Sequence, residues 1–253
     1  MPLSFMWFSY AVKGKNGGEN MILTSDYHTH TPYSHGKGTV LENALQAKKK
    51  GLKQIGITDH GFAHLAFGIE RKKMPQLVAD CRAAAEKTGI EVLCGMEANI
   101  LGESGKTDML PSDYADFDLF IAGKHVFVAY ENFSAWLHYF GGNFLTDKLK
   151  KKPSGRLVRL TTKAYVNAIK NNPVDILSHL NYLCFADAVE VAKCAADYGT
   201  YIEINTKKTH LTDEEWQNVV DKTAARFVID SDAHSPGRVG DTRLADELFA
   251  RVA

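Results

Sequence analysis

Short apolar runs alternate with amphipathic stretches of helical periodicity along most of the chain. The apolar runs predict strands at residues 21–26, 52–58, 90–96, 118–122, 174–177, 200–204 and 227–229. Helices are predicted between them, after Thr39, over 74–87, 160–170 and 186–198, after Thr212 and after Asp241. Runs that are apolar on both faces and joined by helices are typical of parallel strands with crossover connections. We therefore expect a single α/β domain, a distorted (β/α)7 barrel of the TIM type, with a doubly wound open sheet as the alternative.

Local signals at the ends of these stretches support the helices. Thr39 with Glu42, and Thr212 with Glu215, have the spacing of a capping box, in which two otherwise free backbone N–H groups are satisfied. A glycine follows three of the stretches, at positions 51, 89 and 199, where a left-handed residue commonly ends a helix.

Two segments lie outside this alternation. Residues 1–20 join an aromatic-rich run to the polar stretch KGKNGGEN, and we interpret them as an N-terminal extension of the domain at 21–253. They lack the basic region and cleavage site of a signal peptide. Residues 126–157 combine an aromatic-rich stretch with lysines at 148, 150, 151 and 152. We expect an extended loop with some helix there, either packed over a satellite core or forming a wall of a substrate site.

Composition and charge narrow the class of protein. The 253 residues include 30 basic and 30 acidic side chains, and 45% of them are hydrophobic. A net charge of +0 disfavours a general nucleic-acid-binding surface but is compatible with a local basic patch. No apolar run approaches the roughly 18 residues of a membrane span, and the four cysteines contain no C-x-x-C pair. We expect a cytoplasmic protein with reduced thiols, no membrane partner and a homo-oligomer as one option.

Imidazoles and carboxylates gather at the ends of the predicted strands. Seven of the ten histidines and two acidic residues lie at, or shortly after, the carboxyl end of a predicted strand: His28, His30, His35, His60, Glu97, His125, His179, Asp232 and His234. In a parallel barrel these strand ends form one rim, so the nine side chains are expected to converge. Burying so many imidazoles without an anion or a metal would be unfavourable.

The ligand types indicate which metals would bind. Nine nitrogen and oxygen ligands exceed the roughly four to six positions of one ion, and they suit two or three divalent ions that share a bridging carboxylate. Imidazole and carboxylate without thiolate favour Zn²⁺, with Mn²⁺ or Fe²⁺ as alternatives, over magnesium or calcium.

At these residues the sequence resembles the PHP (polymerase and histidinol phosphatase) family. The matching segments are HTHTPYSHGKG at 28–38, ITDHG at 57–61, GMEANI at 95–100, AGKHVF at 122–127, LSHLN at 177–181 and DSDAHSPGRVGD at 230–241. The resemblance is strongest to the stand-alone phosphatase branch with three metal ions, and it implies a distorted (β/α)7 barrel. One departure is that His179 precedes Leu180, where the family often has proline, which affects the expected loop shape.

The resemblance also implies how the ligands are shared. It assigns one ion to His28, His30, Glu97 and Asp232, a second to His35, His60 and His234, and a third to Glu97, His125 and His179. A metal-bridging hydroxide would attack a small phosphomonoester, with Glu97, Asp232 and His60 closest to the reaction and Arg238 binding phosphate. A nuclease or phosphodiesterase with the same metals is the alternative, and a non-catalytic metal-binding module is a weaker one.

Several further residues are expected to support the site or to lie near it. Asp26 and Asp59 could accept the spare N–H of ligand histidines, as carboxylates near metal sites often do, or they could instead form strand-end hydrogen bonds or carry surface charge. Most of the charge on Arg71, Lys72 and Lys73 is expected to be solvated, although phosphate contact is an alternative there. His64 could approach the substrate, whereas His138 and His210 are interpreted as ordinary surface or packing residues.

Overall fold

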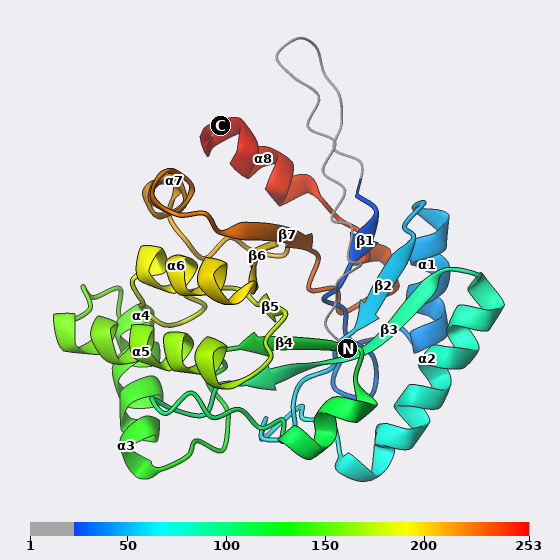
Figure 1. Cartoon of the computed structure of the whole chain (residues 1–253), viewed down its shortest axis with the longest axis horizontal. Helices are drawn as coiled ribbons and strands as arrows, with labels where there is room; N and C mark the ends of the chain where they lie inside the picture. Colours follow the sequence, from blue (N-terminus) through cyan, green and yellow to red (C-terminus); the bar gives the residue numbers. More distant parts are fainter. Residues whose placement is uncertain (1–22, 253) are drawn as a thin grey trace.

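The structure is a computed structural model that describes residues 23–252 (Figure 1). Seven parallel strands form one sheet in sequential order. They are β1 Ser25–Asp26, β2 Gln54–Ile57, β3 Glu91–Asn99, β4 Leu119–Gly123, β5 Ile176–Leu177, β6 Tyr201–Asn205 and β7 Arg226–Asp230. A doubly wound sheet would reverse its strand order, so this order confirms the predicted distorted (β/α)7 barrel. The predicted extension at residues 1–20 lies outside the described residues.

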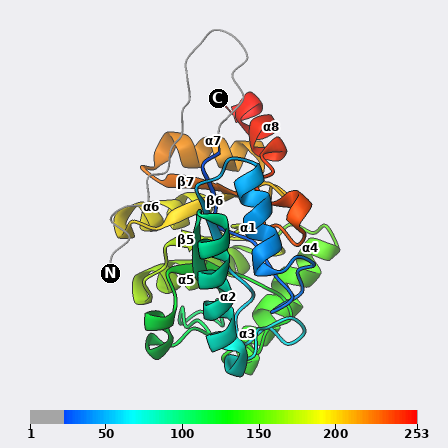
Figure 2. The same cartoon turned by 90° about the vertical axis from the view of Figure 1, so that its right-hand side faces the viewer.

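Helices cover the outside of the barrel. They are α1 Val40–Lys49, α2 Met74–Thr88, α3 Phe133–Trp136, α4 Leu145–Lys148, α5 Gly155–Asn171, α6 Ala188–Tyr198, α7 Asp213–Lys222 and α8 Arg243–Val252, with a π-helix at η3 Leu137–Phe144 and short 3₁₀ turns at η1 Arg71–Lys73, η2 Pro111–Asp116 and η4 Pro236–Arg238. Helices α1 and α2 lie side by side on one flank, with α5 and α6 on the opposite flank (Figures 1 and 2). Both predicted capping boxes are formed, at Thr39 and at Thr212.

Two predicted helix starts were wrong. Helix α5 begins at Gly155 rather than at residue 160, because the Ser154 side chain accepts a hydrogen bond from the Leu157 N–H. Helix α6 begins at Ala188 rather than at residue 186, because the Asp187 side chain caps it. The last helix begins at Arg243, two residues after Asp241, whose carboxylate accepts the Arg243 N–H at 3.3 Å and pairs with the Arg243 guanidinium at 2.8 Å.

The packed core has two parts. A large cluster fills the space between the strands and the helices, and a small one gathers inward-facing side chains from the strands, namely Tyr27, Leu93, Leu119, Ile121, Ile176 and Val228. Because side chains alternate along a strand, Glu97 of β3 points to the same side as Leu93. The strands therefore carry apolar side chains low in the barrel and polar ones at their carboxyl ends.

The barrel is closed between β1 and β7 largely by side chains rather than by a long strand ladder. The buried Asp26 accepts hydrogen bonds from the Ser231 N–H at 3.0 Å, the Ser231 hydroxyl and the Gly240 N–H at 2.7 Å. The Tyr27 N–H donates to Asp230 Oδ1 at 2.6 Å, and one isolated bridge joins 29 to 233. We refer to these contacts between the two edge strands as the seam.

Removing the Asp26 carboxylate should weaken the seam. Asp26→Ala leaves the Ser231 and Gly240 donors buried without their acceptor, so we expect a loss of about 3 kcal/mol in the free energy of unfolding. Urea unfolding measures it, with Asp221→Ala on the exposed side of α7 as a control that should shift stability by less than about 0.5 kcal/mol. Equal stabilities for the two variants would contradict this account of the seam.

Candidate metal centre

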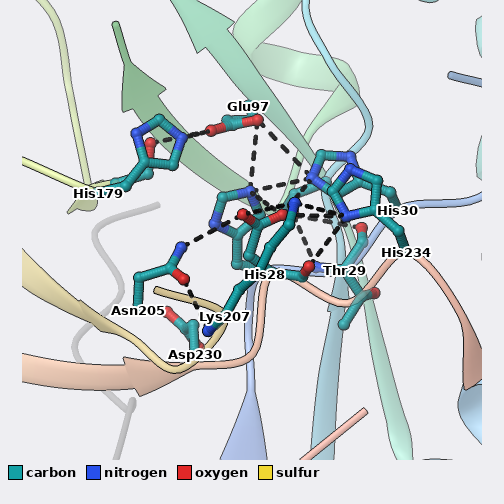
Figure 3. Close-up of polar contacts among 12 residues, drawn as sticks. His28, Thr29, His30, Glu97, His179, Asn205, Lys207, Asp230 and His234 are labelled. Carbon is teal, nitrogen blue, oxygen red and sulfur yellow. Dashed lines mark hydrogen bonds and ion pairs between the residues drawn. The ribbon is translucent and has the colours of Figure 1, made fainter. Parts of the chain in front are cut away.

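A single buried carboxylate lies at the centre of the predicted cluster. Glu97 Oε1 is 2.6 Å from His179 Nε2 and 3.2 Å from His125 Nε2. Glu97 Oε2 is 2.7 Å from His60 Nδ1 and 3.3 Å from His28 Nε2. These four imidazoles follow four different strands, β5, β4, β2 and β1, so the rim of the barrel brings them together. Figure 3 shows Glu97 with two of them, His179 and His28.

A second group of side chains adjoins the first across the seam. His30 Nε2 lies 3.1 Å from His28 Nε2 and 3.3 Å from Asp232 Oδ1, and His234 Nδ1 lies 3.2 Å from the same Asp232 oxygen. The His35 ring stacks on that of His60, with 4.9 Å between ring centroids. All nine predicted ligand positions thus lie in one connected cluster.

The cluster forms the floor of a cavity of about 560 Å³. Seven of its lining residues are among the nine: His35, His60, Glu97, His125, His179, Asp232 and His234. Because ligand sites of roughly 300–1,000 Å³ accept small organic molecules, the cavity has room for a substrate and not only for ions.

The backbone makes room for the cluster at unusual positions. A Cβ on Gly123, the last residue of β4, would lie 2.3 Å from Ser178 Oγ and 3.0 Å from Glu97 Oε1, so only glycine fits beside this carboxylate. His179 and Asp232 have positive φ angles of 26° and 45°, a region that non-glycine residues seldom adopt. The loop after His179, where proline is missing, is held instead by Asn181, whose amide forms two hydrogen bonds with the Ala186 backbone.

Electrostatics within the cluster are strongly coupled. Burial alone would raise the pKa of Glu97, but the imidazoles of His125 and His28 hold it well below its usual range. Burial lowers the pKa of His30, and neighbouring His60 lowers it further. The cluster therefore combines an ionised carboxylate with a neutral imidazole, the forms that bind metal ions.

The donor atoms fit divalent metal ions. Three overlapping sets of side chains place ligand atoms within 4.8 Å of one another: His28, His30 and Glu97; His60, Glu97 and His125; and His30, His60 and His234. Within the described part of the chain, the Nδ1 atoms of His30, His35 and His179 are buried without a hydrogen-bond partner, and the 2.7 Å contact between Glu97 Oε2 and His60 Nδ1 does not have hydrogen-bond geometry. Unpartnered polar atoms are costly in a folded interior, and a shared cation would satisfy those that face the cluster.

The residues that orient the ligands differ from those predicted. Asp59 accepts hydrogen bonds from Thr31 and Ser34, and Asp26 is used at the seam, so the expectation that they bind ligand histidines was wrong. Both carboxylates hold the loops that carry ligands.

The partners of the ligand histidines are Glu203 and Asn99, which the sequence analysis missed. Glu203 Oε1 lies 2.5 Å from His28 Nδ1, and its Oε2 accepts the His179 N–H at 2.6 Å. Asn99 Oδ1 lies 2.8 Å from His125 Nδ1. Glu203 lies in β6, and Asn99 is the last residue of β3. Both are polar residues at inward-facing positions toward the carboxyl end of a strand, and this position was the signal that could have identified them.

Two basic residues lie beside Asp232. Lys207, also missed, has its Nζ 3.2 Å from Asp232 Oδ2 and 3.2 Å from His234 Nδ1. Arg238 lines a smaller adjoining cavity with Lys207 and His234. Its guanidinium donates to the Thr206 and Ser231 carbonyl oxygens at 3.2 and 3.4 Å.

Some residues that line the cavity were predicted to do so, and one was not. Phe127, Phe144 and Lys148 from the 126–157 segment line it, so this segment is a wall of the cavity. His64 lines it, as expected, and so does His210, which was wrongly interpreted as an ordinary residue. His138 packs outside it against Thr161, at 3.1 Å.

The basic run after β2 lies in surface ion pairs. Arg71 pairs with Asp113 at 2.7 Å, and Lys72 and Lys73 both pair with Glu70. Phosphate contact by this run is therefore not supported.

Comparison with known proteins gives the class to which the fold and cluster belong. The family model of the PHP domain matches residues 26–207. The chain belongs to the PHP family.

The chain is similar to particular relatives over most of its length. It is 34% identical to a "probable phosphatase" of Thermoanaerobacter sp. (strain X514), covering 87% of this chain and 82% of the relative. It is 31% identical to another from Vibrio campbellii, covering 92% and 86%. The fold is also that of a histidinol phosphate phosphatase from Lactococcus lactis, solved with zinc, L-histidinol and phosphate, with a TM-score of 0.58, 16% identity and 91% and 94% coverage.

Two broader expectations can be compared with the structure. Among the helices of residues 23–252, none is both long and apolar enough to cross a bilayer. Cys81, Cys94, Cys184 and Cys194 are buried free thiols.

The metal-free protein should lose stability as the pH falls. Burial lowers the pKa values of His60 and His64 to about 4, whereas both would titrate near 6.5 when unfolded. At these two positions the unfolded chain therefore binds more protons than the folded one below pH 6.5. Burial raises the pKa of Asp59 to about 6, and nearby carboxylates raise the pKa values of His28 and His179 in spite of burial, so these three groups act in the opposite direction. We expect a net loss of roughly 2 kcal/mol between pH 7.5 and pH 5.

Urea midpoints of chelator-treated protein at the two pH values measure this loss. His64→Gln removes one of the titrating groups and should reduce the dependence on pH. A midpoint that is unchanged or higher at pH 5 would contradict the assigned burial of these imidazoles.

Proposed function

We propose that the protein is a metal-dependent phosphatase that hydrolyses small phosphomonoesters. The observation that carries the proposal is the buried Glu97 carboxylate, which lies within 3.3 Å of imidazole nitrogens from four strand ends. Bound divalent ions would supply positive charge against the phosphoryl oxygens and would lower the pKa of an attacking water. The names of the PHP relatives agree with this activity.

The nine side chains provide enough ligands for two or three ions, and we propose zinc, with manganese or iron as alternatives. Glu97 is the bridging ligand in this scheme, because its two oxygens face different imidazoles. The three sets of atoms overlap the sets that the family resemblance implies, with His30 and His60 taking places there given to His35 and His179. We assign all nine as ligands, and the division among ions remains part of the proposal.

The chain's other residues would orient these ligands and the phosphate. Glu203 and Asn99 fix the ring orientation of His28 and His125, and such partners commonly contribute 10- to 100-fold to metal affinity or activity. The Lys207 ammonium lies 3.2 Å from Asp232 Oδ2, so we propose that it binds a phosphate oxygen. Arg238 stays our candidate for a second phosphate contact, from the adjoining cavity.

The compartment is also proposed from the chain. Four buried thiols without a disulfide are typical of a reducing environment, so we propose that the protein works in the cytoplasm.

Replacing the central carboxylate should reduce both metal binding and turnover. Glu97→Gln keeps the volume of the side chain but removes the charge that four imidazoles face. We expect bound metal to fall below half of the wild-type content and kcat/KM for p-nitrophenyl phosphate to fall by at least about 100-fold. Elemental analysis and steady-state kinetics measure the two effects.

The exposed Glu103→Gln serves as the matched control, since Glu103 pairs with Lys163 on the surface. It should retain metal and activity. Full hydrolysis by chelator-treated wild-type protein would refute the proposed function.

A phosphodiesterase or nuclease is the second candidate function. The aromatic and basic residues that line the cavity favour it, because such surfaces bind single-stranded nucleic acids. If the protein is a monoesterase, kcat/KM for p-nitrophenyl phosphate should exceed that for bis-p-nitrophenyl phosphate by at least about 100-fold in metal-loaded enzyme. Comparable values, or preference for the diester, would select the second candidate. Turnover of neither would favour a non-catalytic metal-binding module.

A further inference from the structure

A stack of aromatic rings leads to one wall of the cavity. Part of the 126–157 segment folds into a continuous helical stretch, α3, η3 and α4, at Phe133–Lys148. Along it the rings of Phe133, Trp136, Phe140 and Phe144 stack in turn, with centroids 5.3–5.7 Å apart and interplanar angles of 11–24°. The last three of these rings are four residues apart, and the wide turn of the π-helix brings them almost into line.

Phe144, at the cavity end of this stretch, and Phe127, which precedes the stretch, form an aromatic wall of the cavity. Their centroids are 6.4 Å apart and their planes meet at 60°, whereas Phe133 and Trp136 are absent from the lining. Phe67 lines the cavity beside His35, on which it stacks at 4.3 Å. Phe127 is 54% exposed and Phe67 is 42% exposed, so part of each ring is open to a ligand.

The π-helix is anchored so that these rings stay in place. The buried Asn143 donates to Thr161 Oγ1 at 3.0 Å, and its carbonyl oxygen accepts the Phe185 N–H at 3.0 Å. These contacts tie η3 to α5 and to the loop that follows His179. The aromatic wall is therefore a fixed part of the cavity and not a solvated loop.

The charges on the wall are positive. Lys148, Lys207 and Lys208 line the cavity, and Lys148 Nζ lies 5.5 Å from the centre of the Phe144 ring. Among the described lining residues the acidic ones are Glu97 and Asp232, both within the metal cluster. A leaving group that enters this space meets rings and ammonium groups but no free carboxylate.

We propose that the substrate's leaving group is a planar ring that carries a second anionic group. This inference rests on the proposed phosphatase activity and names its substrate class. With phosphate at the metal cluster, the ring would lie against Phe127 and Phe144, and the second anion would pair with Lys148 and Lys208. A small polyol would leave the rings without contact, and a cationic leaving group such as an amino alcohol would be repelled by the lysines.

Two matched probes separate the ring from the charge. 4-Carboxybenzylphosphonate and 4-(aminomethyl)benzylphosphonate share a ring and a non-hydrolysable phosphonate but carry opposite charges at the far end. Calorimetry on metal-loaded protein should give at least about fivefold tighter binding of the carboxylate. The double variant Lys148→Gln with Lys208→Gln should bring the ratio close to one, whereas Lys151→Gln should leave it unchanged.

The ring contact is tested in the same assay. Phe144→Ala should weaken both probes about tenfold while keeping their ratio, because a stacking ring is lost and no charge changes. Phe144→Leu retains apolar volume and should show a smaller loss in the same direction, which guards against misfolding of the alanine variant. Phe133→Leu, on the same helical stretch but away from the cavity, is the control and should bind both probes normally.

The outcomes distinguish this inference from the proposed function. If inorganic phosphate binds and p-nitrophenyl phosphate is hydrolysed, but the two probes bind equally or Phe144→Ala has no effect, the substrate class is wrong and the phosphatase stands. If neither metal nor inorganic phosphate binds, the proposed function fails first and the inference with it.

Discussion

The site depends on one buried negative charge surrounded by imidazoles. Glu97 would be protonated in an apolar interior, and burial alone raises its pKa. Four histidines from four strands reverse that effect. One of them, His28, has its Nε2 3.1 Å from His30 Nε2, so a shared cation is the natural counterpart of these donors. No single segment of the chain could bring these side chains together, because they come from four strands whose ends meet only at the rim of the barrel.

Around this centre, distinct groups perform distinct tasks. Glu203 and Asn99 orient imidazoles from within the barrel, whereas Asp26 and Asp59 hold the backbone of the loops that carry them. Glu203 and Asn99 occupy inward-facing positions of β6 and β3, which place them beside the rings, whereas Asp26 and Asp59 reach N–H groups and hydroxyls of the loops. The metal ligands and the residues that orient them would act on any phosphate ester, whereas the aromatic wall would select the organic part of the substrate.

Much of the fold and the ligand set could be predicted because both depend on local patterns. Apolar runs gave the seven strands, and the position of His60 or His125 just after such a run placed each on the common rim. Glu203 was missed because its charge, in an apolar run, reads as an ordinary strand residue until its distance from His28 is known. The prediction for Asp59 was wrong because the residue is next to His60 in sequence but not in space. Side chains alternate along the chain, so Asp59 points toward Thr31. The π-helix could not be foreseen, since its anchor Asn143 acts through Thr161 and Phe185, distant in sequence.

The seam has a consequence for the order in which the centre can be assembled. His28 and His30 lie on one side of it, and Asp232 and His234 lie on the other, about two hundred positions later in the chain. The complete set of metal-ligand atoms therefore forms only after the last strand has been synthesised and has docked beside the first. Tight binding of the ions would then require a closed barrel. The binding free energy would stabilise the seam, where β1 and β7 meet.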